Sequence, residues 1–320
     1  MASAGTVSLI RSPSPDAIAE AAKALLAGKL VGMPTETVYG LAADATNEVA
    51  VSRIYTTKGR PSFNPLIVHC EDLDLVKDLI ELSPEAGVLA GAYWPGPLTL
   101  VGNIKQTNTV CELARAGLDS LAVRIPGHPT ARALLKAVGR PLVAPSANPS
   151  GQLSPTSAQH VADDLGEALA MILDGGPTER GVESTIVDVR SLPFHVLRAG
   201  PIPRSEIESH VGKLAAKDLP VTSERPTSPG QLLRHYAPNA RLRLNVRSPN
   251  RDEAWLGFGD CPGATLNLSP SGDIPEAERN LFSMLRILDQ THDRIAVAPM
   301  PVSQLSEALH DRLARAAESD

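Results

Sequence analysis

A short stretch between two apolar runs concentrates side chains that can bind an anion. Lys58 and Arg60 flank a single glycine, and Ser62 and Asn64 follow at alternate positions. A lysine offers a compact charge and an arginine a planar fork of donors, and phosphates and carboxylates bind to both. The spacing is compatible with one wall of a polyanion site, although the residues alone do not favour this over an ordinary surface turn. A solvated basic turn remains the alternative interpretation, because exposed Lys and Arg are common and rarely need a partner.

The elements around this stretch predict a loop that begins where a buried strand ends. The apolar run 30–33 stops at Pro34, which cannot donate to a strand ladder. Asn47 is a suitable N-cap, and Glu48 suits the positive end of a helix dipole. A helix is therefore expected to lead to the basic pair, which would lie just past its C-terminus.

Further motifs follow in order along the chain. They are YWPGPLTL (93–100), GLDSLAVRIPGHP (117–129), APSANPSG (144–151), DGG (174–176), GVESTIVD (181–188) and LRAGPI (197–202). Together with Lys58-Gly59-Arg60 and Ser146-Ala147-Asn148, they resemble the YrdC-like family of threonylcarbamoyl-AMP synthases. The resemblance spans nearly all of the first two hundred residues. The segment SPGQLLRHYAP (228–238) resembles the linker of the longer, two-domain members.

The resemblance implies an L-threonylcarbamoyladenylate synthase, which is a nucleotidyltransferase. Such an enzyme makes threonylcarbamoyl-AMP and pyrophosphate from L-threonine, bicarbonate and ATP. The product serves threonylcarbamoyl adenosine modification of tRNA beside the anticodon, and separate transferase proteins perform that step, so direct tRNA contact is not required. A carbamate nucleophile and a pyrophosphate leaving group need alignment and charge neutralisation more than a strong base.

The resemblance also assigns roles to residues. Lys58 and Arg60 are the expected catalytic pair. The expected L-threonine contacts are Thr35, His69, Arg124 and Ser184, with Arg124 gripping the carboxylate. The expected ATP contacts are Lys58, Arg60, Ser62, Asn64, Ser120, Ala122, Ser146, Asn148, Ser154, Arg198 and Tyr236. Mg²⁺ is expected with ATP, and whether Glu36, Asp44, Asp174 or Glu183 holds it stays open.

Structural interpretations remain open for several of these residues. His69 could be a satisfied histidine at a strand end, and Ser154 and Ser184 could be turn or cap residues. Tyr236 is expected to close over the nucleotide and exclude water, but with His235 it could simply anchor the linker.

The fold expected from the pattern of elements is α/β with two domains. Strand-length aliphatic runs alternate with helical patterns over residues 1–206, which predicts a large twisted mixed sheet, as the family resemblance also implies. Residues 207–240 have the composition of a linker and are expected to form a lid over the active site. Strands and helices alternate again over 241–320, which predicts a small doubly wound parallel domain.

The final helix departs from the family pattern. Gln304, Ser306 and His310 stand where a glycine-rich turn and an asparagine are usual before Asp-Arg-Leu. The role of the second domain is therefore open.

Composition bounds the remaining alternatives. The 320 residues are 42% hydrophobic and carry a net charge of −6, which disfavours tight unspecific binding of nucleic acid. The three cysteines have no metal-ligand spacing, and neither a signal peptide nor a membrane span is apparent, so a cytoplasmic location is expected. P-loop, Gly-x-Ser-x-Gly and His-Glu-x-x-His motifs are missing from the sequence.

Two other functional classes remain open. A protein of the same fold could bind RNA without catalysis, although Thr35 and Arg124 argue against this because RNA has no amino-acid carboxylate to grip. A carbamoyl transferase that uses carbamoyl phosphate is the second. Such proteins carry zinc-finger segments, for which this chain has too few cysteines.

Overall fold

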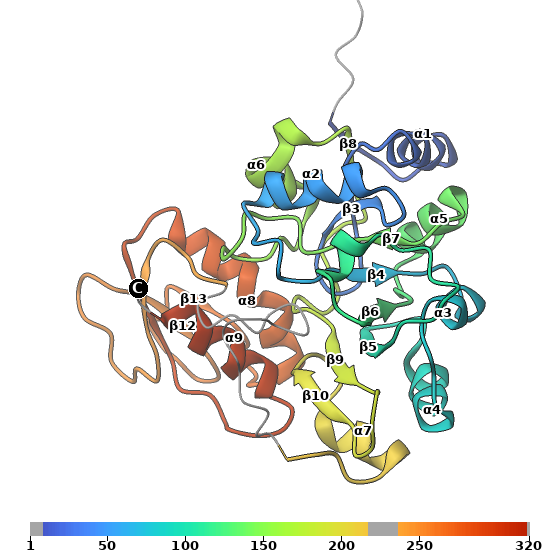
Figure 1. Ribbon diagram of the computed structural model, residues 1–320. Helices are drawn as coiled ribbons and strands as arrows, with labels where there is room; N and C mark the ends of the chain where they lie inside the picture. Colours follow the sequence, from blue (N-terminus) through green and yellow to red (C-terminus); the bar gives the residue numbers. More distant parts are fainter. Residues whose placement is uncertain (1–8, 217–235, 319–320) are drawn as a thin grey trace, which may run out of the picture.

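The computed structural model describes residues 9–216 and 236–318, which form a large and a small α/β unit side by side (Figure 1). Most of the predicted lid over 207–240 lies outside the described residues, and so does His235. None of the helices in the described part of the chain is long and apolar enough to cross a membrane.

The large unit is built on a mixed sheet, as predicted. Its described strands, in spatial order, are β1 (Ile10–Arg11), β8 (Met171–Leu173), β2 (Val31–Met33), β3 (Gly40–Asp44), β7 (Leu142–Val143), β4 (Ile67–His69), β6 (Ser120–Arg124), β5 (Leu98–Asn103), β9 (Thr185–Asp188) and β10 (His195–Arg198). Parallel pairs such as β4–β6 and β5–β9 alternate with antiparallel pairs such as β5–β6 and β9–β10.

Helices cover both faces of one half of this sheet. α1 (Pro15–Leu26) and α5 (Pro129–Val138) pack on one face, and α2 (Glu48–Lys58) and α6 (Ala158–Leu165) pack on the other. In β3, Leu41 and Ala43 face α2, whereas Ala42 faces α1 and α5, because successive strand residues point to opposite faces. The predicted cap of α2 is confirmed, since the Asn47 side chain accepts hydrogen bonds from two backbone amides.

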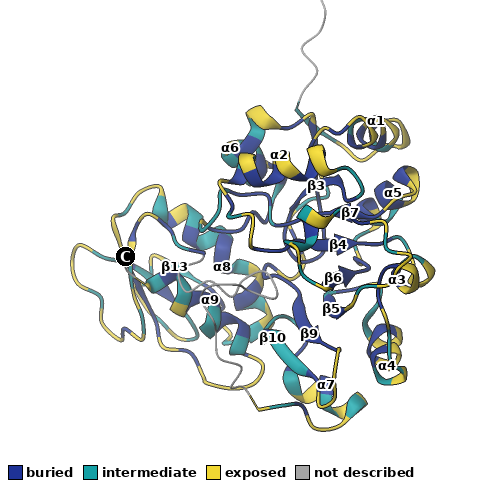
Figure 2. Ribbon diagram, viewed as in Figure 1, coloured by how far each residue is buried: buried dark blue, intermediate teal, exposed yellow. Residues whose placement is uncertain are grey.

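The other half of the sheet has one apolar face and one face that carries polar groups. α3 (Leu73–Leu79), α4 (Pro84–Tyr93) and α7 (Arg204–Val211) pack on the apolar side. Of two short 3₁₀ turns, Glu112–Arg115 precedes β6 and Gly166–Ala168 follows α6. On the opposite side, Ile67 and His69 of β4 lie beside Ala122 and Arg124 of β6, in register. The inner strands of this sheet are mostly buried, the edge strands β1 and β10 are partly exposed, and the outer faces of the helices are exposed (Figure 2).

The small unit contains a second, parallel sheet, which confirms the predicted small parallel α/β domain. Its strands run in the order β11 (Arg241–Arg243), β14 (Arg294–Val297), β12 (Ala254–Gly257) and β13 (Leu266–Asn267), with helices α8 (Ile274–Asp289) and α9 (Glu307–Ala317). The residues that depart from the family pattern shape the turn before α9. The Ser306 hydroxyl donates to the Pro301 carbonyl, and the Gln304 side chain accepts from the Ser205 amide of the large unit.

The two units pack closely against each other. Gly181 has a φ of +71°, and a Cβ there would lie 2.4 Å from the Cα of Arg279 in α8, so the contact requires glycine. Arg286 of α8 also pairs with Asp164 of α6 at 2.6 Å. α7 runs across the predicted boundary at residues 206 and 207, and its Ile207 is buried against the large sheet. The exact domain limits stay a prediction.

Candidate active site

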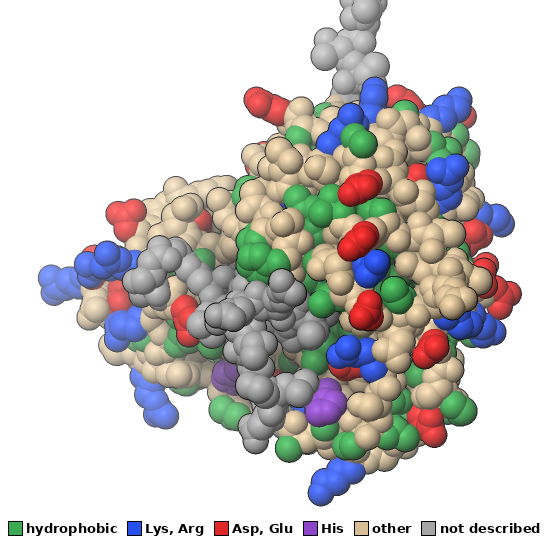
Figure 3. Space-filling view, viewed as in Figure 1, with side chains coloured by type: hydrophobic (Ala, Val, Ile, Leu, Met, Phe, Trp, Pro, Cys, Tyr) green, Lys and Arg blue, Asp and Glu red, His purple; other side chains and the backbone are tan. Residues whose placement is uncertain are grey.

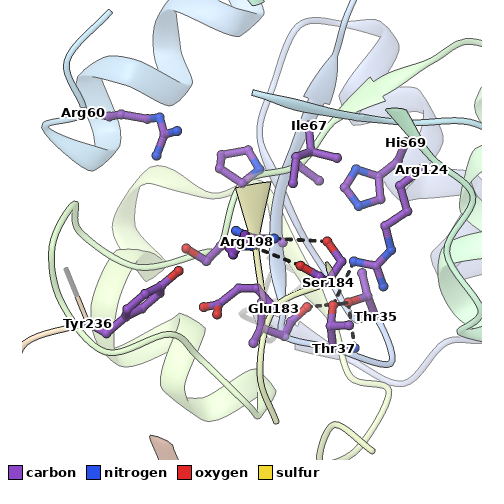
Figure 4. Close-up of a pocket in the computed structure, with 15 residues that line it drawn as sticks. Thr35, Thr37, Arg60, Ile67, His69, Arg124, Glu183, Ser184, Arg198 and Tyr236 are labelled. Carbon is purple, nitrogen blue, oxygen red and sulfur yellow. Dashed lines mark hydrogen bonds between the residues drawn. The ribbon is translucent and has the colours of Figure 1, made fainter. Parts of the chain in front are cut away.

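A pocket lies on the polar face of the large sheet, where side chains from distant segments converge (Figure 4). Its lining comprises Thr35, Thr37, Val38, Gly40, Arg60, Ile67, His69, Arg124, Ala144, Pro145, Ser146, Glu183, Ser184, Arg198 and Tyr236. Figure 4 shows Arg124, His69, Thr35 and Thr37 together on one side, Arg198 and Ser184 in the middle, and Tyr236 and Arg60 farther across. The pocket therefore has two ends, and cationic side chains occur at both.

Arg124 dominates the first end. Its Nη2 lies 2.6 Å from Glu36 Oε1, its Nη1 donates to the Thr37 hydroxyl at 2.9 Å, and its Nε donates to the Gly96 carbonyl at 3.1 Å. The Thr37 hydroxyl also lies 2.9 Å from the Thr35 hydroxyl. An arginine has five N–H groups. Three are used in these bonds, so two can still donate to a ligand's carboxylate.

Glu36 lies behind Arg124 and stays ionised. Burial would raise the pKa of its carboxyl, but the charge and hydrogen bond of Arg124, together with the Gly127 amide, bring that pKa below its usual value. The pair is fixed in this buried position because an isolated charge there would be costly.

His69 is a neutral polar group in the pocket wall. Burial, and secondarily Arg124, lower the pKa of its imidazole to about 3. Its Nδ1 is buried and has no hydrogen-bond partner among the described residues. A buried nitrogen without a partner is costly unless a ligand or water satisfies it. This favours the ligand-binding interpretation of His69 over that of a satisfied histidine at a strand end.

Arg198 and Ser184 form the middle of the pocket. Arg198 donates through Nε to the Ser184 carbonyl and through Nη2 to the Ser184 hydroxyl, both at 3.1 Å. The Ser184 hydroxyl also lies 2.7 Å from the Thr99 hydroxyl. Burial lowers the pKa of Arg198, although Tyr236 and Glu183 partly offset this. The serine thus fixes the direction of the guanidinium.

The predicted catalytic pair separates in space. Arg60 lines the pocket, and its Nη2 donates to Asn64 Oδ1 at 2.7 Å, which leaves Nη1 able to donate elsewhere. Burial lowers its pKa to about 10, so it remains charged. Lys58 instead donates to the backbone carbonyls of Ser146 and Asn148 in the loop after β7. Burial lowers the pKa of Lys58 well below its usual value.

The structure places about half of the predicted site residues in the pocket lining. Those that line it are Thr35, Arg60, His69, Arg124, Ser146, Ser184, Arg198 and Tyr236. Those that lie outside its lining are Lys58, Ser62, Asn64, Ser120, Ala122, Asn148 and Ser154. Several of the second group shape the walls: Asn148 donates to the carbonyls of Pro149 and Gln152, and Ser154 donates to Glu183. Ser62 is exposed and borders a different depression.

Sequence reasoning missed Thr37, and it considered Glu183 only as a metal ligand. Thr37 stands two residues after Thr35, and in an extended loop this spacing puts both hydroxyls on one side, which could have signalled it. Glu183 pairs at 2.7 Å with Arg312, which is 129 positions away in the small unit. No local pattern indicates such a contact.

The four carboxylates considered for magnesium already have partners. Glu36 and Glu183 pair with arginines, Asp44 pairs with Arg140 at 3.0 Å, and Asp174 accepts from the Gly176 amide. Within residues 9–216 and 236–318, no three His, Cys, Asp or Glu side chains gather as a metal site would require.

Two family models and several known proteins match this chain. Residues 23–200 match the model of the Sua5, YciO and YrdC proteins, described as "Telomere recombination", and residues 202–318 match "Threonylcarbamoyl-AMP synthase, C-terminal domain". A Bacillus subtilis protein named threonylcarbamoyl-AMP synthase is 47% identical over 236 residues, covering 73% of this chain and 68% of the relative. A Pyrococcus abyssi protein of the same name is 39% identical and covers 90% of both chains. The crystal structure of P. abyssi Sua5 complexed with L-threonine matches with a TM-score of 0.87 at 36% identity, covering 97% of this chain and 96% of that one.

Proposed function

The chain belongs to the Sua5, YciO and YrdC family in its two-domain form, and we propose that it is a threonylcarbamoyl-AMP synthase that consumes L-threonine, bicarbonate and ATP. The observation that carries the proposal is the convergence of Arg60, Arg124 and Arg198 on one pocket that also holds threonine and serine hydroxyls. A carboxylate and a triphosphate are the two anions that such a site must accommodate together.

The geometry supports a division of the substrates between the two ends of the pocket. Arg124 has two N–H groups left for the carboxylate of L-threonine, and the unpaired His69 nitrogen and the Thr35 hydroxyl lie beside it to bind the rest of the amino acid. Arg198 in the middle of the pocket and Arg60 at the other end would neutralise the phosphates of ATP. The amino acid and the nucleotide would thereby meet near Ser184, in the middle of the pocket.

The reaction then follows from alignment. The threonine amine, in its neutral form, condenses with bicarbonate to give a carbamate anion and water. A carbamate oxygen attacks the α-phosphorus, the bond between this phosphorus and the bridging oxygen breaks, and pyrophosphate leaves with the electron pair. Arg60 and Arg198 stabilise the charge on the phosphates, and no side chain has to remove a proton in this step.

Magnesium would enter as the complex with ATP. The supporting argument is chemical, because Mg²⁺ is usually held by one or two carboxylates together with substrate phosphates. It would supply charge neutralisation to the leaving pyrophosphate.

The product would pass to separate proteins that modify tRNA. Figure 3 shows one face of the molecule. Among the described residues on this face, Lys and Arg side chains are scattered between acidic ones and form no broad basic patch. This face and the net charge of −6 offer little attraction to a polyanion as large as tRNA.

The proposed function is tested by pyrophosphate release from the purified chain with magnesium and ATP. Release should require both L-threonine and bicarbonate, and omitting either should return it to background. Release that persists without L-threonine would contradict the proposal, as would an absence of release with all three substrates present.

A further inference from the structure

One arginine of the small unit reaches the wall of the pocket. Arg312 of α9 is completely buried, and its Nε lies 2.7 Å from Glu183 Oε2. Its Nη2 donates to the Ala199 carbonyl at 3.0 Å, and its Nη1 bonds the neighbouring Asp311. Its guanidinium lies 4.9 Å from the centre of the Tyr236 ring, within the range of a cation–π contact.

Two of these partners face the substrate side. Glu183 and Tyr236 both line the pocket, whereas Arg312 lies behind them. The Glu183 carboxylate is held at both oxygens, because Ser154 donates to Oε1 and Arg312 to Oε2. An anionic side chain therefore stands in the wall of a pocket that must accept anionic substrates.

Glu183 also interacts electrostatically with a second cation, Arg198. Burial alone would raise the pKa of this carboxyl, but Arg312, Arg198 and the bond from Ser154 outweigh burial and bring it below its usual value, so Glu183 is ionised. Arg198 is buried and directed by Ser184, and it has N–H groups left for a ligand. Glu183 and Arg198 line the same pocket and interact electrostatically, so if Glu183 lost its bond to Arg312, these N–H groups would be a source of compensation.

We propose that Arg312 is a positioning residue of the synthase site, acting as the counter-ion that keeps Glu183 from capturing Arg198. This inference rests on the proposed function. It gives the small domain a defined role in the reaction. When the small domain docks Arg312 against Glu183, Arg198 stays available for the phosphates of ATP, and the ring of Tyr236 is supported at the same time.

A second interdomain arginine provides a matched control. Arg286 of α8 pairs with Asp164 at 2.6 Å and also donates to the Leu153 carbonyl, so it joins the same two units. It is nearly buried, with 14% of its side chain exposed, but it lies outside the pocket lining. A substitution of Arg312 or Arg286 weakens the contact between the two units, but only the substitution of Arg312 removes the ion-pair partner of Glu183.

The test compares Arg312→Met with Arg286→Met in the full chain by pyrophosphate release and thermal melting. Both variants should melt at lower temperature. Arg312→Met should raise the KM for ATP at least tenfold and leave the KM for L-threonine within about threefold, whereas Arg286→Met should leave both within about twofold. Equal effects of the two variants on the KM for ATP would overturn the inference.

A double variant makes the test independent of the stability of the single one. Glu183→Gln with Arg312→Met removes the Glu183 charge that would otherwise lose its counter-ion, and with it the carboxylate that would capture Arg198. It should therefore recover a KM for ATP within about threefold of the unaltered chain. A KM that stays raised at least tenfold in a folded double variant would overturn the inference. Failure of the unaltered chain to release pyrophosphate would instead count against the proposed function.

Discussion

Two buried arginine–glutamate pairs stand at different places around the pocket, and they present opposite charges to it. In the large unit, Arg124 lines the pocket and Glu36 lies behind it. Where the units meet, Glu183 lines the pocket and Arg312 lies behind it. In both pairs the rear residue holds the front one, so the same interaction yields a cation for substrate at one place and a restrained anion at the other.

The difference teaches that a residue's charge does not reveal its role in a buried site. Arg124 and Arg312 are both almost fully buried and both bonded to a carboxylate. Arg124 is still able to donate into the pocket, whereas Arg312 lies outside the pocket lining. The first is a substrate ligand in our proposal and the second a positioning residue. The predictions below test this distinction.

The largest effect is expected for Arg124, the cation that lines the pocket. Arg124→Met should lower kcat/KM by at least about 10³-fold, and it should also lower the free energy of unfolding by about 3–5 kcal/mol, because Glu36 would remain buried without its partner. Pyrophosphate release and chemical denaturation measure the two effects.

A double variant separates the loss of turnover from the loss of stability. Glu36→Gln together with Arg124→Met removes the unpaired charge, so it should recover most of the stability while turnover stays lost. Turnover near that of the unaltered chain would show that Arg124 does not hold the substrate.

A smaller effect is expected for a cation that does not face the pocket at all. Lys58→Met removes the donors to the Ser146 and Asn148 carbonyls and should reduce kcat/KM by about 10²-fold through displacement of the loop. Hydrogen exchange should quicken in the peptide covering 144–152. Loss of turnover with unchanged exchange there would mean that Lys58 contacts the substrate directly.

Glu278 is another buried carboxylate, close enough to Arg312 to interact with it, and it should affect stability instead of turnover. Burial raises the pKa of Glu278 to about 7, despite Arg312 and Arg180 nearby. Because the folded chain binds this proton more tightly than the unfolded chain, the contribution of Glu278 to stability falls as pH rises from about 4.5 to about 7 and stays low above it.

Glu278→Gln should therefore stabilise the chain at pH 8 by on the order of 1–3 kcal/mol and have little effect at pH 4.5. Denaturation curves of both chains at the two pH values check this. An equal gain in the free energy of unfolding at both pH values would indicate that ionisation of Glu278 is not the cause.

The smallest effect is expected for a hydroxyl outside the pocket. Ser62→Ala should change kcat/KM by less than about twofold, because Ser62 is exposed and does not line the pocket. Ser184→Ala is the matched change inside it, where Arg198 and Thr99 would lose a partner, and about a tenfold decrease is expected. A tenfold loss from Ser62→Ala would restore Ser62 as an ATP contact.

Much of the fold could be predicted from the sequence, for identifiable reasons. β6 and β10 are short aliphatic runs bounded by breakers, and α5 has both a strong apolar period and a terminal glycine. β3 is hard to predict because Gly40–Asp44 is rich in small residues and directly follows a polar loop. α4 is hard to predict because its glycines weaken the helical pattern.

The site was predictable as a set of motifs but not as a geometry. The Lys-x-Arg pair was visible, but only the close packing of the loop after β7 decides that Lys58 binds carbonyls while Arg60 lines the pocket. The contact between Arg312 and Glu183 depends on how the units built on the two sheets dock, and no local propensity encodes that docking.

The alternation along β4 also limits how this protein can change in length. Ile67 and His69 face the pocket while Val68 faces the core, and each is matched in register to a residue of β6. An insertion or deletion of one residue inside β4 would turn the imidazole into the apolar core and the valine into the pocket, even though every residue type was retained. Length variation among functional variants should therefore be confined to connecting loops, and a screen of single-residue deletions should find the strands of this face among the least tolerant segments.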